Sequence, residues 1–173
     1  DRYEVSAEGA VTAEYPFVVR DGNVLNDRLI DLGSVQLVAF NDLGDVAGTV
    51  KGPGPGFFGS LPLVIRPRQD GSGGRVWNED KDGDGVNDLA LYLPLPSGYH
   101  RGYVKDMNGK GTIVGSVNDG SEWGRAAIWQ VDWGGRAATV TMLGTVVADY
   151  DGSSAVGVNA VNQVVGHNSK GSW

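Results

Sequence analysis

Four aspartates fall at alternate and near-alternate positions within a single nine-residue stretch, Asp80-Lys81-Asp82-Gly83-Asp84-Gly85-Val86-Asn87-Asp88. The stretch fits the pattern D-x-D-x-D-G-x-x-D. Such carboxylates, together with the carbonyl group of the seventh position, supply the oxygen ligands that a hard cation prefers, and the glycine at the sixth position permits a sharp turn. We therefore predict a Ca²⁺ site formed by Asp80, Asp82, Asp84, the carbonyl of Val86, and Asp88.

The residues around this loop indicate that it is not an EF-hand. The twelfth position, where an EF-hand carries a glutamate, is Leu91, and the flanking segments 76–77 and 89–92 are typical of strands. The ion would thus organise the tip of a β-hairpin, with a structural role. The alternative is a solvated acidic loop without an ion, in which neighbouring carboxylates repel by up to about 1 kcal/mol per pair in water.

Other kinds of reactive site find little support in the sequence. The chain has no cysteine and two histidines, His100 and His167, and neither histidine has a serine or carboxylate at a spacing that defines a catalytic motif. No glycine-rich phosphate loop precedes a helical pattern. The sequence predicts a protein that is not an enzyme.

An internal repeat specifies the elements that must hold the acidic loop. Three octets, residues 41–48, 108–115 and 159–166, share the pattern N-x-x-[GN]-x-[VI]-[VA]-G. The asparagine can accept a hydrogen bond from the backbone two residues on, and the fourth position carries the residues that best tolerate positive φ. Each octet is therefore predicted to be a tight turn that enters a buried strand, with a closing glycine where another segment approaches closely.

Apolar segments that end in tryptophan follow the octets and divide the chain into units of about 45–50 residues. We place the repeat ends near residues 18, 77, 129 and 173, and expect Trp77 and Trp129 to be core anchors. The excess length of the first unit lies in residues 51–74, which we interpret as a Gly/Pro-rich surface insertion. The whole chain, 1–173, is predicted to be one repeat-built β domain.

The fold class predicted from these units is all-β. Asp-Gly and Gly-Gly turns between β-rich runs predict hairpins, and no apolar stretch has helical periodicity. About three four-stranded units favour a β-propeller-like repeat domain, with a β-trefoil as the alternative. Three units are fewer than the four to eight blades of most propellers, so we expect the chain to be part of a longer protein or to self-associate.

The repeat resembles the extracellular HAF repeat family. Residues 31–33, 40–48, 126–129, 143–144 and 155–166 match its pattern. The departures are Asp88-Leu89-Ala90, where the family has Asp-Leu-Gly, and the absence of the Gly-Gly that follows it. The acidic loop is similar to the calcium hairpins of FG-GAP and integrin-type propellers. The resemblance implies a secreted surface protein with no assigned chemistry.

The net charge of the chain limits the classes of partner that it is expected to bind. The 21 acidic and 14 basic residues give a net charge of −7, which disfavours binding to nucleic acid or to an anionic membrane, and no apolar run is long enough to span a bilayer. The chain begins with Asp1, which suggests a mature product or an excised fragment whose targeting signal is out of view. With the secreted character that the resemblance implies, we expect a secreted or cell-surface protein whose signal peptide has been removed.

The function predicted is that of a non-enzymatic, calcium-stabilised module for extracellular assembly or adhesion, through a protein partner or self-association. One alternative is a lectin-like module that stacks the loop aromatics Trp123 and Trp133 on sugar rings. Another is an accessory domain of a larger secreted hydrolase or lyase.

Overall fold

The computed structural model describes residues 2–5, 11–15, 35–51, 59–83, 86–121, 123–145 and 151–169, and of residues 2–5, 11–15 and 51 the backbone alone. These residues form antiparallel sheets and no helix. The all-β prediction is therefore confirmed for this part of the chain, and none of it forms a helix able to span a membrane.

Three repeat sheets make up the body of the molecule. The first consists of β3 (Val35–Phe40), β4 (Val46–Lys51), β5 (Ser60–Ile65) and β8 (Ala90–Tyr92). The second consists of β9 (Arg101–Met107), β10 (Thr112–Asn118), β11 (Arg125–Asp132) and β12 (Ala137–Met142). The third contains β13 (Gly152–Val158) and β14 (Val164–Ser169). The first two are four-stranded meanders with the same strand order.

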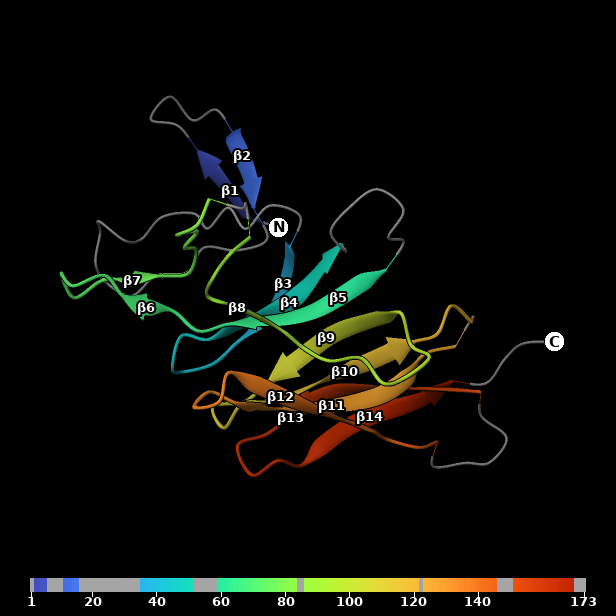
Figure 1. The fold of residues 1–173 in the computed structure, drawn as a ribbon. Coiled ribbons are helices and arrows are strands. Elements are labelled where there is room, and N and C mark those ends of the chain that lie inside the picture. Colours follow the sequence, from blue (N-terminus) through green and yellow to red (C-terminus); the bar gives the residue numbers. More distant parts are fainter. Residues whose placement is uncertain are drawn as a thin grey trace.

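Two short hairpins lie outside the repeat sheets. β1 (Arg2–Val5) pairs with β2 (Val11–Tyr15), and β6 (Arg68–Gln69) pairs with β7 (Arg75–Val76). The β6–β7 hairpin belongs to a long connection between β5 and β8, which also contains the acidic loop. The acidic loop is thus carried on a projection from the first repeat sheet (Figure 1).

The repeat sheets are stacked in layers (Figure 1). β9 packs against β3, β4 and β5 of the first sheet, and β13 packs against β9, β10 and β11 of the second. The first and second sheets are therefore each covered by the opening strand of the next. No sheet of the described residues closes into a barrel, so the β-trefoil alternative gains no support.

Apolar clusters fill the spaces between and beside these layers. The largest lies between the first two sheets and includes the fully buried Trp129, with Val64 and Ile113. A smaller cluster, around Val114 and Ala155, joins the second and third sheets. A third cluster, around the buried Trp77, covers the other face of the first sheet.

The octet turns form as predicted. The side-chain Oδ1 of Asn41, of Asn108 and of Asn159 accepts hydrogen bonds from the backbone N–H groups two and four residues on, at 2.9–3.1 Å. The fourth positions all have positive φ: 83° at Gly44, 78° at Gly111 and 64° at Asn162. The turn chemistry read from the sequence is confirmed in all three repeats.

The closing glycine of each octet faces a β-bulge. The pairing register shifts opposite or beside Gly48, Gly115 and Gly166, which leaves one extra residue in the preceding strand. A Cβ atom at any of these glycines would collide with a backbone carbonyl oxygen of that strand. The predicted close approach is therefore a backbone contact within each hairpin, created by the bulge.

The structure corrects the placement of the insertion. Residues 60–65, part of the predicted surface insertion 51–74, form β5, whose last four residues are buried between β4 and β8. Pro62 concealed this strand, because proline in an apolar run argues against an inner strand. It is tolerated near the start of β5, where the pairing with β8 has not yet begun.

The predicted repeat end near residue 77 is also corrected, because β5 ends the corresponding segment at Ile65. Ile65 pairs with Val46 as Trp129 pairs with Ile113, so Ile65 is the counterpart of Trp129. Trp77 is a core residue, as predicted, but of the long β5–β8 connection. The repeat ends near residues 18 and 173 lie outside the described residues.

Candidate functional site

The acidic loop, Asp80–Asp88, lies in the connection between β7 and β8. Its two ends are held together: the Asp88 N–H donates to the Glu79 carbonyl at 2.7 Å, and the Lys81 N–H donates to Asp88 Oδ2 at 2.8 Å. Within the loop, the Gly83 N–H donates to Asp80 Oδ1 at 2.7 Å, and Gly83 has a φ of 75°. The described ends of the loop are therefore joined at a neck, where Asp88 is hydrogen-bonded to Glu79 and Lys81, the two neighbours of Asp80.

The neck is anchored to the core by Asn87. Its Oδ1 accepts hydrogen bonds from the N–H groups of Glu79 and Leu89, at 3.1 and 3.0 Å, and its Nδ2 donates to the carbonyl of Trp77 at 2.8 Å. The Trp77 indole N–H in turn donates to the carbonyl of Gly44, in the first octet turn, at 2.8 Å. A chain of hydrogen bonds thus connects the acidic loop to the first repeat turn.

Basic side chains beside the loop are paired with Glu79, which precedes the motif. Lys81 Nζ lies 2.9 Å from Glu79 Oε2, and Arg68 donates to Glu79 Oε1 at 2.7 Å. These two hydrogen-bonded cations, Lys81 first, hold the pKa of Glu79 below its ordinary value. Lys81 therefore forms its ion pair with Glu79, which is not one of the predicted calcium ligands.

The acidic loop also contacts the second repeat. Arg136, in the turn between β11 and β12, donates through Nη2 to the carbonyl oxygens of Asp88 and Ala90, at 2.8 and 3.3 Å. Arg136 adopts a left-handed backbone conformation, with a φ of 47°. The loop exit thus lies at a junction between two successive repeats.

The predicted ligand set is brought together in part. Asp80 lies between Glu79 and Lys81, the two residues to which Asp88 is hydrogen-bonded, and Asp82 and Val86 are exposed in the loop, whereas Asp84 and Gly85 lie outside the described residues. Among the residues that are described, no group of three or more acidic or histidine side chains is close enough to hold a metal ion. The donor types that the motif offers, four carboxylates and a carbonyl within nine residues, are those that calcium prefers.

The two loop tryptophans lie at junctions between repeats. Trp133, in the β11–β12 turn, is partly buried, and the Arg66 guanidinium group of the first repeat lies 4.1 Å from its ring centroid. Trp123 is half-buried and packs beside Gly152 at the start of the third repeat. Both indoles thus make contacts within the chain, and their proposed role in sugar binding stays a prediction.

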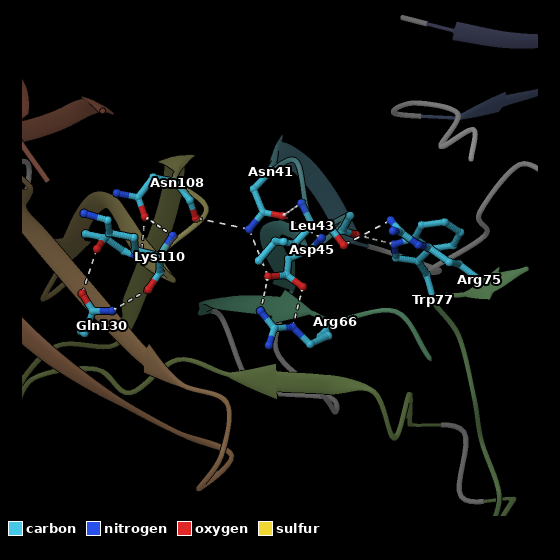
Figure 2. A network of polar contacts seen from close by, with 11 residues as sticks. Asn41, Leu43, Asp45, Arg66, Arg75, Trp77, Asn108, Lys110 and Gln130 are labelled. Atoms are coloured by element: carbon cyan, nitrogen blue, oxygen red, sulfur yellow. Dashed lines mark hydrogen bonds and ion pairs between the residues drawn. The ribbon is translucent and has the colours of Figure 1, made fainter. Parts of the chain in front are cut away.

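A ladder of asparagines links the three octet turns, and the sequence analysis did not foresee it. Asn41 Nδ2 donates to the Asn108 carbonyl at 3.3 Å, and Asn108 Nδ2 donates to the Asn159 carbonyl at 2.8 Å. Figure 2 shows the first of these steps. The signal is present in the sequence, since asparagine is the only residue at the first octet position, but the turn by itself already accounts for that asparagine.

A second repeated feature joins the fifth octet position to the residue opposite it. The fully buried Asp45 accepts two hydrogen bonds from Arg66, at 2.8 and 2.7 Å (Figure 2). At the same register in the second repeat, Thr112 donates to Gln130 at 2.8 Å. The pair is thus charged in the first repeat and neutral in the second.

His100 and His167 are both exposed and lie in different repeats. His167, on β14, borders a groove of about 550 Å³ between the third sheet and the second. The lining is mainly apolar, with Ala126, Leu143, Ala155 and Val164. The polar residues Ser153, Ser154, His167 and Asn168 also belong to the lining, so the groove offers apolar contacts with a few polar groups among them.

No protein-family model matches the sequence, and neither a curated protein nor a solved structure shows significant similarity to the chain. The resemblance to the HAF repeats therefore stays a prediction that rests on the motifs in this sequence.

Proposed function

We propose that the chain is a secreted, non-enzymatic repeat module that takes part in extracellular or cell-surface assembly through protein–protein contacts. The supporting observation is the exposed end of the repeat stack. Val165 of the third repeat is 63% exposed, although Ala47 and Val114, at the same register in the first two repeats, are fully buried. Because another sheet covers this position in the first two repeats, the exposed Val165 face of the third repeat is suited to bind a further β-sheet.

The arrangement of the repeats favours a β-propeller-like assembly. Two successive four-stranded meanders pack face to face, and a third pair of strands continues the series. Blades of four antiparallel strands that pack on one another are the units of β-propellers. This is also the arrangement that the resemblance to the HAF repeats implies.

Calcium is proposed to stabilise this module at the Asp80–Asp88 loop. Asp80, Asp82, Asp84, Asp88 and the carbonyl of Val86 would hold the ion, which would neutralise the clustered negative charge and order the loop beside Arg136. The role is structural, because the loop connects two repeats through Arg136 and reaches the core through Asn87.

The magnitude of this stabilisation can be stated. Extracellular calcium modules bind with a Kd of about 10⁻⁴–10⁻³ M, so calcium at about 2 mM would add about 0.6–1.8 kcal/mol to the free energy of unfolding. For a chain of this size, the melting temperature would rise by about 1–7 °C. Thermal unfolding with EDTA and with calcium measures this shift, and calorimetric titration measures the affinity.

A matched pair of variants identifies the site. Asp82→Ala should abolish both the shift and the binding heat. Asp42→Ala removes an equally charged, exposed carboxylate at a turn position that is Ala160 in the third repeat, and should leave both intact. Identical melting temperatures of the unmodified chain in EDTA and in calcium would rule out the proposed ion.

A further inference from the structure

The third repeat sheet has an unpaired edge among the described residues. β4 lies between β3 and β5, and β10 lies between β9 and β11, whereas β14, their counterpart, pairs with β13 alone. The groove beside the third sheet, lined by Ala126, Leu143 and Val164, lies between β14 and the second sheet. A strand added to β14 would direct every second side chain into this groove.

A segment of the chain itself has the sequence such a strand requires. Tyr15-Pro16-Phe17-Val18-Val19-Arg20 matches Leu61-Pro62-Leu63-Val64-Ile65-Arg66, which forms most of β5 and its continuation. Proline, the central valine and arginine are identical, and the other three positions are apolar in both. Residues 16–20 lie outside the described part of the chain, and their match in sequence to β5 identifies them as the candidate strand.

The match defines a register. Leu63 pairs with Gly48, Val64 with Ala47 and Ile65 with Val46. The same register on β14 places Phe17 opposite Gly166, Val18 opposite Val165 and Val19 opposite Val164. Phe17 and Val19 would then point into the groove, as Leu63 and Ile65 point into the Trp77 cluster.

We propose that this strand comes from a second copy of the chain, so that copies associate head to tail. In its own copy, the segment leads into β3 at residue 35, in the first sheet, which the second sheet separates from β14 (Figure 1). Stacked sheets lie about 10 Å apart, so the separation is about 20 Å. If residues 21–34 form the hairpin and fourth strand that their sequence pattern predicts, none of them is left to cross this distance.

The asparagine ladder supports the same arrangement. Asn41 and Asn108 each donate to the backbone carbonyl of the next octet asparagine. Asn159, the last of the series, donates to the side chain of Gln163 at 2.7 Å, just as Asn41 also donates to Asp45. A second copy stacked on the third sheet would bring its Asn41 carbonyl to the position that continues the ladder. Two copies together have six repeat units, within the range of β-propellers.

The interface rests on the proposed assembly role and deepens it by naming the partner. Sedimentation velocity and light scattering of the chain should show a concentration-dependent rise in mass from 18.2 kDa to at least twice that value. Val165→Lys should keep the chain monomeric, because the lysine would be buried in the interface. Val161→Lys is the control: Val161 is 67% exposed, and Lys110 occupies the same turn position in the second repeat.

A mixing experiment tests the head-to-tail geometry. Phe17→Asp should disable the inserted strand and leave β14 intact, while Val165→Lys should do the reverse. Each variant alone should be monomeric, and their mixture should form one-to-one pairs, because a heterologous interface needs one intact surface from each copy. A mixture that stays monomeric would overturn the proposal.

Other outcomes are equally decisive. A monomeric unmodified chain, with a melting temperature that falls in Phe17→Asp, would show that the strand closes on its own copy and overturn the proposal. Loss of association in Val161→Lys as well as Val165→Lys would also overturn it. Calcium titration of the same samples separates the proposed interface from the proposed calcium site. A monomer that binds calcium overturns the interface alone. Pairs of chains that bind no calcium overturn the calcium site alone.

Discussion

Gly115→Ala should destabilise the protein, although glycine-to-alanine changes at ordinary backbone angles usually stabilise. Gly115 is the closing glycine of the second octet, in the centre of β10, and its φ is not in the left-handed region. An added Cβ would overlap the Tyr103 carbonyl oxygen and lie 3.0 Å from the carbonyl carbon and 3.2 Å from the Val104 Cα atom. All three atoms belong to the backbone of β9, so no side-chain rotation relieves the contact.

The size of the effect follows from two opposing terms. Overpacking of a buried site costs about 1–3 kcal/mol, and the upper value applies because two paired strands must separate. Alanine also restricts the unfolded chain more than glycine does, which raises the free energy of unfolding by about 0.4–1 kcal/mol. The net loss should be about 2 kcal/mol, which lowers the melting temperature of a chain of this length by about 4–8 °C.

The assay is thermal and denaturant unfolding of Gly115→Ala beside a control, Gly109→Ala. Gly109 belongs to the same octet, no atom lies within 4 Å of its added Cβ, and Ala160 occupies that position in the third repeat. The control should be neutral or up to about 1 kcal/mol more stable than the unmodified chain. If both variants unfold at the same temperature, the close backbone approach at the bulge is not what requires glycine.

Two further substitutions probe the repeated features. Gly111→Ala should cost about 1 kcal/mol more than Gly111→Asn, because Gly111 has a φ of 78° and asparagine adopts the left-handed conformation at the same position in the third repeat; equal melting temperatures would contradict this. Arg66→Gln should cost about 1.5–3 kcal/mol by leaving the buried Asp45 without its cation. Adding Asp45→Thr, which reproduces the neutral pair of the second repeat, should recover part of that loss, and a double variant less stable than Arg66→Gln would refute the interpretation.

The local structure was predictable where single residues determine it. Each octet turn depends on an asparagine side chain and on one residue that accepts positive φ, and both requirements are visible in sequence. The antiparallel strands around these turns followed from the same signals. The nine-residue acidic motif was placed in a connection between strands, and the structure places it between β7 and β8.

Features that depend on distant residues could not be predicted. β5 was hidden because Pro62 resembles a strand breaker until its place at the start of the pairing with β8 is known. Trp77 and Trp129 both end apolar pairs, yet only Trp129 lies in the third strand of a repeat sheet. The asparagine ladder and the contact from Arg136 to Asp88 join residues more than 45 positions apart, and no local pattern identifies such pairs.

The connection between the third and fourth strands differs most between the repeats. Residues 66–89 link β5 to β8 and include a hairpin and the acidic loop, whereas residues 133–136 make the equivalent link between β11 and β12. The sheets keep the same strand order despite this difference. The connection between the third and fourth strands is therefore a grafting site: a peptide epitope or a binding loop inserted after Gly134, with Trp133 and Arg136 kept for their contacts with the first repeat, would be displayed at the rim of the scaffold.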